Sequence, residues 1–229
     1  YLRPDGHIVL NGDDDKLSTV AGYKGIRPVF FGLDQNRDVY ADEIVNRGLK
    51  GVACRIHLGG DAFSVLVPMP GIHMVYNALA AAAVGRNYGL TTEEIKKGIE
   101  SLEAISGRFK MIETDSLLIV DDCYNANPMS MKASLDVLHD GAGRRVAILG
   151  DMGELGENEI ALHREVGAHA AACGIDACVC VGSLARHMAE AAREADPEFP
   201  VFYEETRESL LENLGRYIQK GDTVLVKAS

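Results

Sequence analysis

The sequence lacks the features of a nucleic-acid-binding, membrane-spanning or secreted protein. Its 23 lysines and arginines are outnumbered by 34 aspartates and glutamates, giving a formal net charge of −11, whereas a nucleic-acid surface needs a basic footprint. No apolar run approaches the length of a membrane span, and no signal peptide opens the chain. Residues 1–4 read instead like the interior of a longer protein. We therefore expect a cytoplasmic protein with no nucleic-acid partner and no membrane insertion.

Cysteine is also scarce, and it does not occur in a paired metal-binding or redox spacing. The five cysteines are odd in number and form no paired C-x-x-C motifs, as expected for reduced thiols in the cytoplasm. Cys178 and Cys180 would share one face of a strand as small core residues, with a zinc site as the alternative. The sequence therefore predicts no metal site of its own.

The first part of the chain predicts antiparallel strands and two helices. With 229 residues, 47% of them hydrophobic and 25% charged, the chain can form one large or two smaller globular domains. Short β-branched runs punctuated by glycine indicate strands at residues 7–10, 29–32, 38–45, 52–58 and 62–67. Helices are expected at residues 73–88 and 91–102, the second beginning with a capping box of Thr91 and Glu94.

From residue 107 the pattern changes to alternating strands and helices. After a hairpin of residues 109–113 and 117–121, strands are expected at residues 145–149, 177–181, 201–203 and 223–226. The helices between them are expected at residues 128–138, 158–173, 184–194 and 207–218. Such alternation predicts a parallel sheet with helices on both faces. We therefore predict an α/β protein with two domains, residues 1–105 and residues 106–229, the second a doubly wound sheet.

A polar turn follows the apolar strand of residues 117–120. The sequence there is DDCYNANP, so acid and amide side chains fall where the strand ends and a helix begins at Pro128. They are Asp121, Asp122, Asn125 and Asn127. Ligands of open α/β sheets bind outside the carboxyl ends of strands, which makes these residues binding candidates. An acidic helix cap with an Asx-rich turn explains the same residues, although one cap needs fewer of them.

A glycine-rich loop, GDMGELG at residues 150–156, follows the next expected strand. Its spacing resembles a dinucleotide-binding fingerprint, but Asp151 and Glu154 would repel a pyrophosphate. The following strand also ends in Val-Gly-Ser, without the acid that would hold a ribose. An acidic loop at the end of a strand suits a cation better, such as a substrate ammonium. A tight turn with capping acids remains the alternative.

One helix carries a second candidate pair. His73 and Asn77 are four residues apart, and therefore on one face of a helix that is otherwise rich in alanine. Alanines allow a flat ligand to approach closely, so the pair could reach an adenine edge. Capping or packing of the helix is the other explanation.

Together these segments resemble the Mur ligases, the ATP-dependent amide-forming enzymes of peptidoglycan synthesis. The resemblance covers most of the chain. Its motifs are N-x-D-D at residues 11–14, G-x-H-x-x-x-N-A-L-A-A from Gly71, S-G-R at residues 106–108, DDCYNANP, GDMGELG, and V-K-A-S at residues 226–229. Within the family, YNANP and GDMGELG resemble the motifs of the enzyme that joins D-alanyl-D-alanine to UDP-N-acetylmuramoyl-tripeptide. Met74 and Cys123 depart from the residues often found at their positions.

The resemblance implies a part of a larger enzyme. The G-x-x-x-x-G-K-[ST] phosphate loop is absent from the sequence, and the resemblance places it upstream of residue 1. The chain would be the C-terminal part of a central ATPase domain followed by a Rossmann-like ligase domain. ATP and Mg²⁺ would be used, with the Mg²⁺ ligands mostly outside this chain. We expect the 229 residues alone to be inactive.

The resemblance also assigns ATP contacts to both domains. Asn77 would contact the adenine, and Arg108, in a hinge, would hold the ribose and phosphates together with Asp122. Asn125 and Asn127 would shape the turn beside the nucleotide.

The remaining roles concern the second substrate and the reaction. Asp151 and Glu154 would bind D-alanyl-D-alanine, while Lys227 and His163 would be catalytic residues near an acyl phosphate.

Two other functional classes stay open. A folylpolyglutamate- or cyanophycin-type ligase would use an amino acid as its amine, and a non-catalytic Rossmann-like module would only bind a nucleotide or amino acid. A dehydrogenase is disfavoured by the acidic glycine loop.

Overall fold

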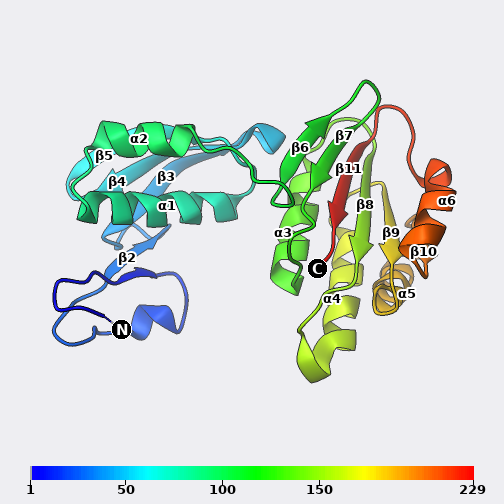
Figure 1. The fold of residues 1–229 in the computed structure, drawn as a ribbon, viewed down its shortest axis with the longest axis horizontal. Helices are drawn as coiled ribbons and strands as arrows, with labels where there is room; N and C mark the ends of the chain where they lie inside the picture. The colour runs from blue at the N-terminus through cyan, green and yellow to red at the C-terminus, as the bar shows by residue number, and fades with distance from the viewer. Residues whose placement is uncertain (1) are drawn as a thin grey trace. The chain divides into compact units, whose positions relative to one another are not determined.

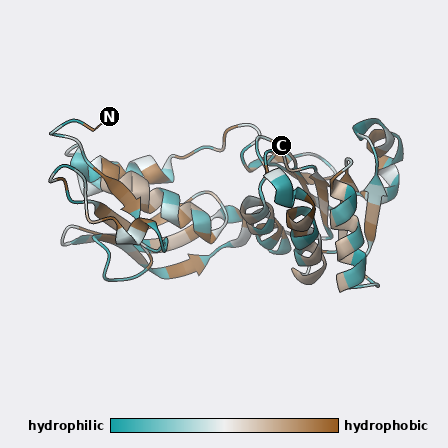
Figure 2. Cartoon of the chain, turned by 90° about the horizontal axis from the view of Figure 1, so that it is seen from below, coloured by the Kyte–Doolittle hydropathy of each residue, from teal (hydrophilic) through white to brown (hydrophobic). Residues whose placement is uncertain are grey.

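The structure is a computed structural model that describes residues 2–229. The chain divides into two compact units, Tyr1–Glu103 and Ala104–Ser229 (Figure 1), where the sequence places a boundary between residues 105 and 106. Figure 2 shows hydrophobic residues along the strands and hydrophilic residues on much of the helix surface. No helix among residues 2–229 is long and apolar enough to cross a membrane.

The first unit is built on a five-stranded sheet in the order β1-β2-β3-β4-β5. Its strands are β1 (Val9–Asn11), β2 (Val29–Gly32), β3 (Val39–Asn46), β4 (Val52–Leu58) and β5 (Asp61–Val67). β1, β2 and β3 pair in parallel, whereas β3, β4 and β5 are antiparallel. The expectation of antiparallel strands is therefore wrong for β1 to β3. Strand direction is set by the path of the connecting loops, and β-branched composition carries no signal of it.

Two helices and two short 3-10 turns complete the first unit. They are α1 (Ile72–Asn87), α2 (Thr92–Glu100), η1 (Leu17–Thr19) and η2 (Gly48–Lys50). α1 shares a hydrophobic core with the sheet, in which Ile56 of β4 and Leu79 of α1 are fully buried. Small residues on α1, such as Ala82 and Ala83, are buried in the same core. The predicted capping box of Thr91 and Glu94 is confirmed at the start of α2.

The second unit contains a six-stranded sheet in the order β10-β9-β8-β11-β7-β6. The strands are β6 (Lys110–Glu113), β7 (Leu118–Asp121), β8 (Arg145–Gly150), β9 (Ala177–Val181), β10 (Val201–Glu204) and β11 (Thr223–Lys227). The predicted hairpin of β6 and β7 is antiparallel. All other neighbouring strands of this sheet, from β7 through β11, β8 and β9 to β10, pair in parallel. The last strand, β11, lies between β7 and β8. The predicted parallel sheet is confirmed.

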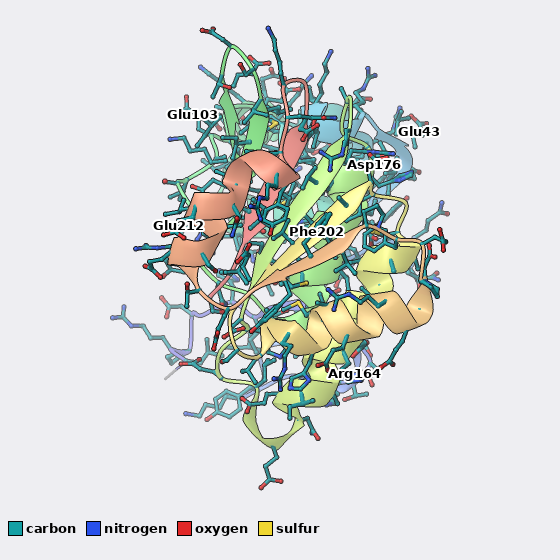
Figure 3. The ribbon with its side chains drawn as sticks, turned by 90° about the vertical axis from the view of Figure 1, so that its right-hand side faces the viewer. Glu43, Glu103, Arg164, Asp176, Phe202 and Glu212 are labelled. Carbon is teal, nitrogen blue, oxygen red and sulfur yellow. The ribbon has the colours of Figure 1, made fainter. Side chains whose placement is uncertain are left out.

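Helices cover both faces of this sheet, as predicted. They are α3 (Pro128–His139), η3 (Gly156–Asn158), α4 (Glu159–Ala172), α5 (Ala185–Ala195) and α6 (Arg207–Tyr217). On one face, Ile148 and Val179 pack with Leu210 of α6. α3 and α5 lie against strands of the other face, with α4 packed on both helices. Phe202 of β10, labelled in Figure 3, contacts the ring of Tyr217 at a centroid distance of 5.0 Å.

The cysteines of β9 belong to the core. Cys178 and Cys180 are buried, and their sulfur atoms lie 3.8 Å apart. They alternate along the strand with Ala177 and Val179, which face α6. No group of three or more His, Cys, Asp and Glu side chains among residues 2–229 is placed to hold a metal ion, so the zinc alternative has no support.

Candidate functional site

The polar turn after β7 and the glycine loop after β8 lie at the same edge of the second unit's sheet. β7, β11 and β8 are parallel and adjacent, so their carboxyl ends share one edge. A Cβ atom at Gly150 would lie 2.7 Å from the Cβ of Ala228, so glycine is needed where β8 and β11 end side by side. The opposite edge carries structural ion pairs, such as Asp176 (labelled in Figure 3) with Arg145.

Ser229, directly after β11, connects the two loops. Its Oγ accepts hydrogen bonds from the backbone N–H of Ala126 (3.1 Å) and Gly153 (3.2 Å). It also lies 3.1 Å from the carbonyl oxygen of Ala126, to which it donates, and its backbone N–H donates to Asp151 O at 3.2 Å. One serine thus joins both candidate loops to the end of the central strand.

A buried ion pair lies beneath the first loop. Lys227 Nζ is 2.6 Å from Asp122 Oδ2 and 3.0 Å from the carbonyl oxygen of Asn125. The Lys227 side chain is 2% exposed and the Asp122 side chain 15%. Asp122 also accepts from Ser134 Oγ (2.8 Å) and from the N–H of Phe109 (3.1 Å). Both charged groups are committed to protein partners, so they shape the loop from within.

The expected hinge segment is fastened to this loop by its backbone. Gly107 N–H donates to Asp121 Oδ2 (3.0 Å), and Gly107 O accepts from Tyr124 N–H (2.9 Å). Gly107 and Phe109 both have positive φ angles, 75° and 55°, a region that side chains rarely adopt. The residue between them, Arg108, stacks on the exposed ring of Tyr124, with 4.0 Å between Cζ and the ring centroid. A guanidinium stacked by its face keeps its in-plane N–H donors available to an anion.

The two asparagines of the turn have different roles. Asn127 caps α3, accepting from Ser130 N–H at 2.9 Å, with Pro128 in the first turn. Asn125 is exposed and gives its carbonyl oxygen to Lys227. The cap alternative is therefore confirmed for Asn127, although the capping residue is an amide and not an acid. Cys123 lies at the surface as a residue, but partial burial of its sulfur atom, together with the nearby Asp121 carboxylate, raises the pKa of the thiol to about 11.

The two acids of the glycine loop also differ. Asp151 Oδ1 accepts from the N–H groups of Leu184 (3.1 Å) and Ala185 (2.7 Å) at the start of α5. One oxygen of the Asp151 carboxylate is therefore occupied as a cap, and the binding of a substrate by Asp151 stays a prediction. Glu154 is exposed and has a φ of 58°, so it remains the acid that can face a ligand.

His163 is a packed structural residue of α4. It is 0% exposed, its Nδ1 donates to the carbonyl oxygen of Glu159 (2.7 Å), and its Nε2 accepts from Met152 N–H (3.0 Å). Both ring nitrogens are therefore occupied. The alternative of a surface histidine is wrong, because the buried ring supports the glycine loop from inside, and the catalytic role of His163 stays a prediction.

The candidates of the first unit lie on α1 and after β1. Asn77 is exposed on α1, with Nδ2 3.4 Å from Met74 Sδ. In the turn after β1, Asp13 accepts from Leu33 N–H (2.6 Å) and pairs with Arg37. Burial opposes ionisation of Asp13, but these hydrogen bonds and one from Tyr76 outweigh it and lower the pKa of the carboxyl.

Sequence reasoning missed three residues of the site: Tyr124, Ser134 and Ser229. Tyr124 and Ser229 stand inside quoted motifs, so their position was visible but their partners were not. Ser134 stands seven residues after Asn127 on α3 and gave no signal, since a serine within a helix most often faces solvent.

Comparison with known proteins gives two family matches and close structural likenesses. A Mur ligase middle domain matches residues 1–85, and a Mur ligase, glutamate ligase domain matches residues 107–229. The UDP-N-acetylmuramoyl-tripeptide–D-alanyl-D-alanine ligase of Bacillus subtilis (strain 168) is 32% identical over 231 residues, covering 100% of this chain and 49% of that protein. The chain spans about half the length of the curated relatives it matches.

Solved structures agree with these matches. A crystal structure of MurF from Acinetobacter baumannii has a TM-score of 0.87 and 30% identity, covering 99% of this chain and 49% of that one. MurF ligase from Thermotoga maritima in complex with ADP has a TM-score of 0.78 and 26% identity, covering 96% and 49%.

Proposed function

This chain belongs to the Mur ligase family, and we propose that the protein containing it is an ATP-dependent ligase. The reaction would add D-alanyl-D-alanine to UDP-N-acetylmuramoyl-tripeptide, in the cytoplasm, where both ATP and the nucleotide-linked peptide are made. The relative from Bacillus subtilis carries the name of this activity. The observation that carries the proposal is the single sheet edge at which the YNANP turn and the GDMGELG loop are joined by Ser229.

The reaction would proceed in two steps. The tripeptide carboxylate attacks the γ-phosphorus of ATP, forming an acyl phosphate and ADP. The amine of D-alanyl-D-alanine then attacks the acyl carbon, phosphate leaves, and the amine loses a proton. Such chemistry depends mainly on positioning and on stabilisation of charge. Among residues 2–229, no three or more His, Cys, Asp and Glu side chains gather as metal ligands. The Mg²⁺ that the reaction would use is expected to be held mostly by residues outside this chain.

Within that reaction, the residues of this chain divide into contacts and supports. Arg108, stacked on Tyr124, would offer its N–H donors to the nucleotide's phosphates, and exposed Asn77 would contact the adenine. Glu154 would face the ammonium of the incoming dipeptide. Asp122 and Lys227 would act indirectly, because their buried pair sets the backbone of the turn.

The choice of amine substrate tests the proposal. The full-length protein should form product from ATP, UDP-N-acetylmuramoyl-tripeptide and radiolabelled D-alanyl-D-alanine, and not when glutamate replaces the dipeptide. Incorporation of glutamate but not the dipeptide would favour a folylpolyglutamate- or cyanophycin-type ligase. Absence of any ATP-dependent product would favour a binding module.

The isolated 229 residues provide a second test. Because their sequence contains no G-x-x-x-x-G-K-[ST] loop, they should release no phosphate from ATP with both substrates present. Phosphate release by the purified 229-residue chain would show that this chain alone can react with ATP, which contradicts the proposal that the ATP phosphates are bound by residues outside the chain.

A further inference from the structure

We propose that Ser229 is a positioning residue for the amine substrate, because its hydroxyl group fixes the glycine loop against the turn after β7. This inference rests on the proposed function and names the residue that sets the geometry of the amine-binding side. Its hydrogen bonds join backbone groups of two loops that are distant in sequence, at Ala126 and Gly153.

The hydroxyl of Ser229 has no capacity left for a substrate. A serine hydroxyl can donate one hydrogen bond and accept two. Ser229 Oγ donates to Ala126 O and accepts from the N–H groups of Ala126 and Gly153, at distances of 3.1 to 3.2 Å. The side chain therefore acts on substrate only through the loops that it joins.

The bond to Gly153 holds the middle of the glycine loop. Upstream, Asp151 is fixed by its cap on α5, and Met152 by His163. Gly153 and Glu154 are exposed, and Glu154 has a φ of 58°, a conformation that needs support from its surroundings. Removing the hydroxyl should therefore loosen Gly153 and Glu154 while the rest of the fold stays in place.

Loosening of Gly153 and Glu154 should weaken binding of the amine substrate. With Asp151 Oδ1 occupied by the first N–H groups of α5, Glu154 is the exposed carboxylate of this loop that can pair with an ammonium group. A loss of about 1.4 kcal/mol from the pairing of Glu154 with the ammonium would weaken binding of the dipeptide about 10-fold. We therefore expect Ser229→Ala to raise KM for D-alanyl-D-alanine by about 10-fold or more. KM for ATP should change by less than about 2-fold, because Ser229 takes no part in the stacking of Arg108 on Tyr124.

The experiment compares three variants of the full-length protein. Ser229→Ala removes the hydroxyl, Ser229→Thr retains it, and Ser101→Ala removes a hydroxyl of the first unit that donates to Gly98 O. Ser229→Thr should restore KM for the dipeptide, and Ser101→Ala should leave it unchanged. Equal changes in KM for both substrates, or an unchanged KM for the dipeptide in Ser229→Ala, would overturn the proposal.

Amide hydrogen exchange gives a readout that needs no activity. The N–H of Gly153 should exchange at least about 10-fold faster in Ser229→Ala, while amides of β8 and β11 keep their protection. If wild type joins no D-alanyl-D-alanine, the proposed function fails, and unchanged exchange at Gly153 separately refutes the fastening role of Ser229. Loss of protection throughout the second unit would also refute it, because Ser229 would then stabilise the whole fold.

Discussion

Replacing Lys227 by methionine should destabilise the second unit by about 3 kcal/mol. Methionine has a similar volume but no charge, so Asp122 would be left as a largely buried carboxylate without its cation. Removal of one partner of a buried pair typically costs about 3–5 kcal/mol, and we expect the lower end. Asp122 would keep its bonds from Phe109 and Ser134, and its side chain is 15% exposed. Replacing both charges, in Asp122→Asn with Lys227→Met, should recover part of the loss.

Native-state hydrogen exchange measures this effect in the second unit alone. A loss of about 3 kcal/mol corresponds to a roughly 100-fold faster exchange of the most protected amides of β8 and β11. Lys132→Met is the matched control, because Lys132 pairs with Glu165 at the surface, where such pairs contribute about 0–1 kcal/mol. The reasoning is refuted if Lys227→Met accelerates exchange no more than Lys132→Met does.

Three further predictions concern the core, the pH dependence and the thiols. Leu135→Ala, at a fully buried position of α3, should lower the free energy of unfolding by about 2–5 kcal/mol in urea titrations. Because hydrogen bonds outweigh burial and lower the pKa of Asp13 below its usual 3.8, the carboxyl stabilises the folded state above that pH. That stability should fade as the pH falls through the lowered folded value, and Asp13→Asn should remove this part of the acid sensitivity of the first unit. Cys123 lies at the surface, and its raised pKa should make it react slowly with Ellman's reagent at pH 8 and faster toward pH 11. Cys123→Ser should abolish this pH-dependent reaction of the folded protein. In denaturant, all five thiols should react.

Local sequence patterns were sufficient for much of the fold. The alternation of strands and helices after residue 107 predicted the parallel sheet, because a parallel strand must be followed by a crossover, usually a helix. The capping box at Thr91 was predictable because it involves only residues 91–94. Strand order, and strand direction within the first unit, were not predictable in this way. Nothing in the sequence of β11 indicates that it pairs between β7 and β8, and β1 to β3 look the same whether parallel or antiparallel.

The sequence pointed to the two loops that Ser229 joins, but not to the contacts that each of their residues makes. Asn127 caps α3, and Asp151 accepts from the first N–H groups of α5. A carboxylate or amide serves equally well as such a cap or as a ligand contact. His163 was placed near the loop, yet its burial depends on the packing of α4, which sequence does not reveal. The role of Ser229 required knowing that two distant loops meet at the end of β11.

The central position of β11 also bears on how the second unit is made. Lys227 and its partner Asp122 are 105 residues apart in sequence, and β7 and β8 each pair with β11 along one edge. Until β11 has emerged from the ribosome, those edges have exposed backbone N–H and C=O groups that can pair with other strands. Contacts of such long sequence separation form slowly. The sheet is therefore expected to close only after β11 has been synthesised, and chaperones would protect the nascent chain until then.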